Sequence, residues 1–137
     1  MGVLLFVAIS GGLARFLSTE GVERDDLTAL IDAQARGDVN RMLDKLSGCR
    51  SHPSCVASAR ANAGRLRRAG VPKILSLKSS TAYSLSGATG KTRLAWTVIG
   101  KLPVVQCIDV RRTGDPLTGI KIVLLSLSAP ISGEGDC

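Results

Sequence analysis

The stretch TRLAWTVIGKLPVVQCIDVRR, residues 92–112, decides the fold class of this chain. Leu94, Trp96 and Val98 alternate with Arg, Ala and Thr, and this period of two predicts a strand over residues 92–99 with one buried face. Gly100–Pro103 predicts a turn, and a second strand is expected over Val104–Arg112. The stretch therefore predicts two sequential strands joined by a short turn.

Two further strands are expected on either side of this pair. The segment Lys73–Ser86 is long and β-compatible, and a turn at Gly87–Gly90 follows it. Four of its side chains are expected on one face, namely Leu75, Leu77, Tyr83 and Leu85. Gly114–Asp115–Pro116 predicts another turn, and the strand Ile120–Ile131 after it is the most apolar of the four. Because both of its faces begin with Ile, Val or Leu, this strand is expected either at the centre of the sheet or with a contact on each face.

The first half of the chain has helical periodicity. A helix over residues 23–36 is predicted by an apolar face of Leu27, Leu30, Ile31, Gln34 and Ala35. Gly37 is a helix stop, and Asp38 caps a second helix that ends at Ser47–Gly48. A third helix is expected from Pro53 to Ala69. Helices followed by four sequential strands predict an α+β domain, with the helices on one side of an antiparallel meander.

An apolar leader precedes this domain. Val3–Ala14 carries no charge, although the run is short for a helix that spans a bilayer and no base precedes it. We interpret residues 1–19 as a membrane anchor or signal segment and residues 20–137 as the folded domain. A lost basic segment before Met1 would explain the missing charge.

The four cysteines, like the leader, indicate a location outside the cytoplasm. Cys49 and Cys55 bracket the short loop CRSHPSC, and their local pairing is the safest prediction. A bridge between Cys107 and Cys137 would fix the C-terminal tail, although four cysteines allow three connectivities. Disulfides form in oxidising surroundings, so we expect the chain at the extracytoplasmic side of the cell membrane or secreted.

Four segments carry a resemblance to a known family. They are Arg15–Asp26 (RFLSTEGVERDD), Ala33–Asp38 (AQARGD), Gly48–Cys55 (GCRSHPSC) and Pro103–Ile131. The chain resembles uncharacterised exported or membrane-anchored proteins of high-GC Gram-positive bacteria. Its element order is similar to the cone-shaped nuclear transport factor 2-like (SnoaL-like) fold. The resemblance implies a membrane-proximal anchor and paired cysteines. Proteins of that fold include isomerases, dehydratases, cargo carriers and secretion-system subunits, so the fold leaves the activity open.

The charge of the chain is concentrated in one part. The net charge is +7, and between Cys49 and Lys121 thirteen Lys or Arg residues stand against Asp109 and Asp115. This excess would attract anionic lipid, an acidic wall polymer or an acidic protein, and its alternative is a solvated basic surface. The candidate anion-binding residues are Arg60, Arg65, Arg67, Arg68, Arg111 and Arg112. Nucleic acid is disfavoured as a partner because stacking aromatic residues are scarce.

Motifs for catalysis, cofactors and metals are weak. The segment Ser86–Thr92 (SGATGKT) resembles a phosphate loop, but Leu85 occupies the position of the first glycine and a strand follows. Cys49, His52 and Cys55 match no common zinc spacing, and we expect no metal and no cofactor. The candidate ligand-binding residues of the cone are Tyr83, Trp96, Gln106 and Asp109, of which Gln106 and Asp109 should point to opposite faces of one strand.

These observations favour a non-enzymatic binding or assembly module with a protein partner or a second copy of the chain. An alternative is a small-ligand-binding or isomerase-type enzyme that uses the cone cavity. A third is an electrostatic binder of anionic lipid or wall polymer. The assembly hypothesis predicts an exposed apolar patch on the Ile120–Leu124 side.

Overall fold

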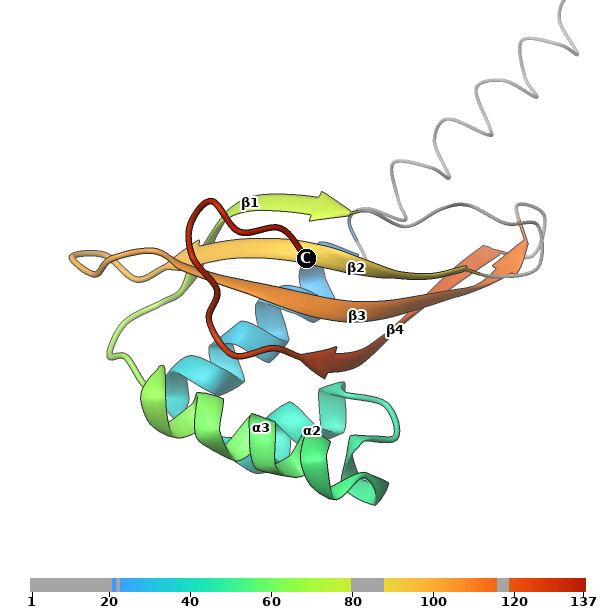
Figure 1. Ribbon diagram of the computed structural model, residues 1–137, viewed down its shortest axis with the longest axis horizontal. Coiled ribbons are helices and arrows are strands. Elements are labelled where there is room, and N and C mark those ends of the chain that lie inside the picture. The colour runs from blue at the N-terminus through green and yellow to red at the C-terminus, as the bar shows by residue number, and fades with distance from the viewer. Residues whose placement is uncertain (1–20, 22, 80–87, 116–118) are drawn as a thin grey trace, which may run out of the picture.

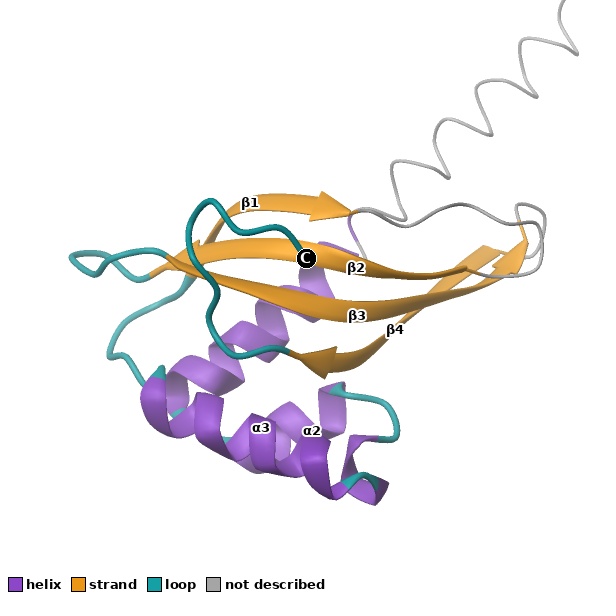
Figure 2. Cartoon of the chain, viewed as in Figure 1, coloured by secondary structure: helices purple, strands orange, loops and turns teal. Residues whose placement is uncertain are grey.

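The computed structural model describes residues 21, 23–79, 88–115 and 119–137, and these form an α+β domain (Figure 1). Four antiparallel strands follow one another in the sheet in the order of the sequence, β1-β2-β3-β4. They are β1 (Lys73–Ser79), β2 (Ala88–Thr97), β3 (Val104–Asp115) and β4 (Gly119–Leu127). Helices cover one face of this sheet, and the C-terminal tail crosses the other face (Figure 2). The predicted meander with helices on one side is confirmed.

Three α-helices are found in the described part of the chain. The first occupies residues 23–36, and it is followed by α2 (Val39–Lys45), the 3-10 turn η1 (Cys49–Ser51) and α3 (Pro53–Arg65). Gly37 ends the first helix at a φ of 75°, which a residue with a side chain rarely adopts. The amide of Asp38 then donates to the carbonyl of Ala33, and the Asp38 carboxylate accepts from the amide of Arg41 at 3.0 Å. The predicted stop and cap are therefore both confirmed.

The third helix ends four residues before its predicted end. The amide of Leu66 still bonds to the carbonyl of Asn62, but the amide of Arg68 donates to the carbonyl of Ala35 in the first helix. This tertiary hydrogen bond draws the chain away from the axis of α3. Sequence periodicity does not contain such a contact, which explains the error.

The core lies between the helices and the sheet. All five side chains expected on the inner face of the first helix are buried, and they share the core with Leu94 and Trp96 of β2 and with Val98 just after this strand. Aliphatic side chains supply nearly all of the rest, with Met42, Leu46, Ile108 and Leu124 among the most buried. The core is therefore built from aliphatic residues around one tryptophan.

Strand β1 differs from its prediction in its facing pattern. A bulge between Ile74 and Ser76 inserts one extra residue, so that Ile74 and Leu77 pack on the core while Leu75 is 55% exposed. The predicted common face of Leu75 and Leu77 is therefore wrong, because a bulge shifts the alternation by one residue. The expected continuation of this strand to Ser86, with Tyr83 and Leu85, lies outside the described residues.

The ends of β2 and β4 also differ from their predicted positions. Residues 88–90, expected in a turn, begin β2 because Ala88, Thr89 and Gly90 pair with the far end of β3. β4 ends at Leu127, and Ile131 makes only an isolated bridge to Val105. β4 is an edge strand and not a central one. Its edge is covered by Leu46, which bridges to Leu124, and by the amide of Ser47, which donates to the Leu124 carbonyl at 2.8 Å.

Two disulfides close the domain, Cys49–Cys55 and Cys107–Cys137. The second bridge holds the tail on the face of the sheet opposite the helices, where Arg93 donates to the carbonyls of Gly133 and Gly135. Both bridges indicate an oxidising environment. The leader at residues 1–19 lies outside the described residues, and within the described ones no helix has the length and hydrophobicity that a membrane crossing requires.

Candidate functional site

The space between the helices and the sheet contains a buried amide cluster. Gln106 of β3 accepts hydrogen bonds at Oε1 from Gln34 Nε2 and from Trp96 Nε1, both at 2.9 Å. Its Nε2 donates to Gln34 Oε1 at 3.2 Å and to the carbonyl of Ser128 at 2.9 Å. Gln34, Trp96 and Gln106 have no exposed surface. Two of the predicted ligand-binding residues are therefore brought together, and their polar atoms are occupied by each other and by Gln34.

A second buried cluster contains an ion pair. Glu23, at the start of the first helix, accepts from Arg112 Nη2 at 2.5 Å and from Thr92 Oγ1 at 3.0 Å. Arg112 Nη2 also donates to Ser79 Oγ at 3.1 Å. The side chains of Arg112 and Glu23 are only 9% and 3% exposed. Arg112 was expected on an anion-binding surface, and this expectation is wrong because Arg112 faces the core and pairs with Glu23.

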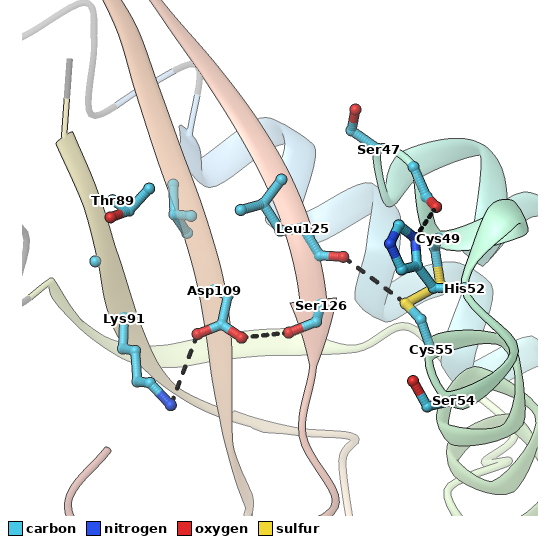
Figure 3. A pocket seen from close by; sticks show the side chains of 13 residues that line it. Ser47, Cys49, His52, Ser54, Cys55, Thr89, Lys91, Asp109, Leu125 and Ser126 are labelled. Atoms are coloured by element: carbon cyan, nitrogen blue, oxygen red, sulfur yellow. Dashed lines mark hydrogen bonds and ion pairs between the residues drawn. A yellow bond between two sulfur atoms is a disulfide. The ribbon is translucent and has the colours of Figure 1, made fainter. Parts of the chain in front are cut away.

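Asp109 lies on the other side of the sheet from Gln106, as the alternation of β3 predicts. One of its carboxylate oxygens is 3.7 Å from Lys91 Nζ of β2, and the other accepts from the Ser126 hydroxyl of β4 at 2.5 Å (Figure 3). These three side chains form a polar row across three strands, on the face that the helices leave open. Lys91 and Asp109 keep about half of their surface in solvent.

This row forms the floor of a groove of about 650 Å³. The loop closed by the Cys49–Cys55 disulfide forms the wall of the groove beside β4 (Figure 3). Cys55 Sγ lies 3.8 Å from the carbonyl oxygen of Leu125, and because a disulfide sulfur carries no proton we treat this as a packing contact. A neighbouring hollow of about 280 Å³ shares Lys91, Asp109 and Ser126 and extends the groove toward Ser128.

His52 stands in the disulfide loop at the rim of the groove. Its Nδ1 lies 2.8 Å from the carbonyl oxygen of Gly48, and because a carbonyl only accepts, Nδ1 carries the proton. His52 is not hydrogen-bonded to Asp109 or Ser126, and no cluster of metal-ligating side chains occurs in the described parts of the chain. The groove thus offers hydrogen-bonding groups, without a paired nucleophile and base.

The remaining predicted anion-binding residues do not form one surface. Arg60, Arg65 and Arg67 are exposed on and just after α3, whereas Arg111 is exposed on the open face of the sheet. Arg68 donates to the carbonyl of Leu102 at 2.7 Å and lies over the Trp96 ring, 5.4 Å from its centroid. Tyr83, the last of the predicted ligand-binding residues, lies outside the described residues.

The expected apolar patch on the Ile120–Leu124 side is not found among the described side chains. Ile122 and Leu124 are buried under the helices, and Val123 is half-buried. The exposed large aliphatic side chains lie elsewhere, at Val71, Leu75, Ile99 and Leu102. They gather at the end of the sheet where β1 begins and β2 turns into β3.

Sequence reasoning missed the Glu23–Arg112 pair. The sequence analysis places Glu23 only at the start of a predicted helix, and it places Arg112 at the end of a strand among the candidate anion-binding residues. A weak signal was present, because Arg112 has the same parity as Ile108 and Val110 and therefore belongs to the buried face. Nothing in the sequence indicated which acid it would meet.

Scans of protein-family models, curated proteins and solved structures returned no significant match to this chain.

Proposed function

We propose that this chain is a non-enzymatic binding or assembly module, built on a nuclear transport factor 2-like cone and working at the extracytoplasmic side of the cell membrane or after secretion. Helices packed on one face of a sequential four-stranded antiparallel sheet support the cone. The two disulfides support a compartment outside the cytoplasm. A membrane contact through residues 1–19 and a protein partner or second copy complete the proposal.

The observation that carries the proposal is the filled interior. An enzyme or ligand carrier that used the cone would need a cavity with at least two ionisable groups aimed into it. The described interior holds one such pair, Glu23 and Arg112, and these two groups bind each other and Thr92. The amide cluster of Gln34 and Gln106 is likewise closed on itself and on Trp96.

The exposed features lie outside this interior. The groove with Lys91, Asp109 and Ser126 is on the open face of the sheet, and the exposed aliphatic residues are at one end of it. Surface recognition needs only such exposed features, whereas interior chemistry would need a cavity. We therefore place the function on the surface of the domain.

The proposal is tested by ligand titration of the full chain, observed by NMR at the Trp96 indole N–H. A mixture of small carboxylic acids, amides and aromatic alcohols is added, because these would compete for the partners of Gln106 and Arg112. We expect the indole resonance to keep its position at every concentration, since Trp96 is buried and bonded to Gln106.

A saturable shift of the indole resonance, reversed on dilution, would show an interior ligand site and overturn the proposal. Resonances of Lys91 and Ser126 serve as the internal control. These residues line the groove, which is open to solvent, so weak shifts at these resonances alone would report binding at the surface and not in the interior.

A further inference from the structure

Three of the most exposed aliphatic side chains in the described chain lie at one end of the sheet. Val71, Ile99 and Leu102 are 75%, 83% and 82% exposed, and we name them the apolar tip. A single exposed aliphatic residue is ordinary on a protein surface, but three together at one end of a sheet indicate a contact surface.

The strand register brings these residues together. Lys73 of β1 pairs with Thr97 of β2, so Val71 and Ile99 each lie two residues beyond the same pair. A side chain at Gly70 would come within 2.7 Å of Val98, which shows how closely the two segments approach. The turn that carries Ile99 and Leu102 extends past the other elements at the end of the β2–β3 hairpin (Figure 1).

Basic residues surround the apolar tip. Lys101 lies between Ile99 and Leu102, Lys73 lies at the start of β1, and both are exposed. Arg68 is fixed beside the tip by its hydrogen bond to the Leu102 carbonyl. The segments that form this end contain no acid, because no Asp or Glu occurs between Asp44 and Asp109. The partner of the tip should therefore be both apolar and anionic.

The shape of the tip favours a lipid surface over a protein. A stable protein–protein interface buries about 800 Å² on each partner and involves roughly 20–30 residues a side, and the three side chains of the tip offer far less. A bilayer has no such threshold, because each inserted aliphatic group and each nearby cation adds its own contribution. A projecting turn also enters the headgroup layer without needing a matching pocket.

We propose that the apolar tip inserts into the headgroup layer of an anionic lipid bilayer, while Lys73 and Lys101 contact the lipid phosphates. This inference rests on the proposed function as a surface-acting module.

The tip is distinct from the leader. The start of the first helix lies away from the tip, because Glu23 there contacts Thr92 and Arg112. The end of that helix lies near the tip, because the carbonyl of Ala35 accepts from the amide of Arg68.

The test uses the full chain with Ile99→Trp, on vesicles of phosphatidylcholine with and without phosphatidylglycerol. Because the leader can hold the chain on any bilayer, the readout is the fluorescence of the introduced indole and its quenching by brominated lipid. The matched control is Lys121→Trp, which places an indole on an exposed site of β4 at the opposite end of the sheet.

We expect a blue shift and quenching for Ile99→Trp on vesicles that contain phosphatidylglycerol, and neither for Lys121→Trp. Adding Lys101→Ala should lower the equilibrium constant for insertion of the tip about fivefold, as expected for one cation near an anionic surface. Adding Leu102→Ser should also weaken it, and salt should reverse part of the signal.

Equal quenching of Ile99→Trp and Lys121→Trp, or equal quenching on vesicles without phosphatidylglycerol, would overturn the lipid assignment. A blue shift that grows with protein concentration in the absence of lipid would show self-association through the tip. That result overturns the lipid assignment and leaves the proposed binding module standing. A ligand-induced shift of the Trp96 indole would overturn the proposed function itself.

Discussion

Replacing Glu23 by leucine tests whether the buried Glu23–Arg112 pair stabilises the fold or serves a ligand site. The substitution removes the carboxylate that accepts from Arg112 at 2.5 Å and from Thr92 at 3.0 Å, and it keeps a side chain of similar volume. Because Arg112 is only 9% exposed, its charge stays buried after its carboxylate partner is gone. Breaking a buried pair in this way costs about 3–5 kcal/mol of the free energy of unfolding.

The double variant Glu23→Leu, Arg112→Met measures the coupling between the two residues. Removing both charges together should recover most of the loss, since buried pairs are often replaceable by apolar residues of similar size. A deficit of about 1–3 kcal/mol should remain, because the Thr92 hydroxyl is buried and has lost its acceptor.

The assay is urea denaturation with both disulfides intact, followed by the fluorescence of Trp96, which is fully buried. Arg50→Ala is the control: Arg50 lies 2.6 Å from Asp44, but the two side chains are 54% and 66% exposed, so the loss should stay below about 1 kcal/mol. Groups kept for catalysis or ligand binding often reduce stability. A single Glu23→Leu variant that is as stable as the wild type, or more stable, would therefore refute the structural role.

Three further predictions concern other parts of the fold. Gln106→Leu should lose about 2–4 kcal/mol of unfolding free energy in the same urea assay, because it leaves both the Trp96 indole and the Gln34 amide without their partner; a change below about 1 kcal/mol would contradict the amide cluster. Cys107→Ser with Cys137→Ser should lose about 3–4 kcal/mol, the chain-entropy value for closing this loop, and unchanged thermal unfolding in calorimetry would contradict it. Asp38→Ala should lose about 1 kcal/mol through the missing cap, while Asp38→Asn, which keeps an acceptor, should lose less; equal losses would contradict the capping role.

The sequence predicted the architecture because its signals were local. The alternation around Trp96, the apolar face of the first helix and the glycine stop at Gly37 each depend on residues only a few positions apart along the chain. The short loop between Cys49 and Cys55 is local in the same sense, and its disulfide is present. These features could be inferred without tertiary information.

The errors occurred where a distant contact decides the geometry. The end of α3 depends on the bond from Arg68 to Ala35, and the facing of β1 depends on a bulge opposite β2. The Glu23–Arg112 pair joins residues 89 positions apart, and no pattern in the sequence selects that pairing. The prediction of site residues was affected in the same way, because Arg112 was assigned to the surface by its charge alone.

Hydrogen exchange at the Trp96 indole tests the central claim that the interior is closed by its own side chains. The indole proton is bonded to Gln106 and fully buried, so its exchange should require global unfolding. The free energy obtained from exchange should then equal the free energy of unfolding from urea. Exchange at a rate faster by several orders of magnitude, with unchanged urea stability, would show that solvent reaches the interior and would contradict the account.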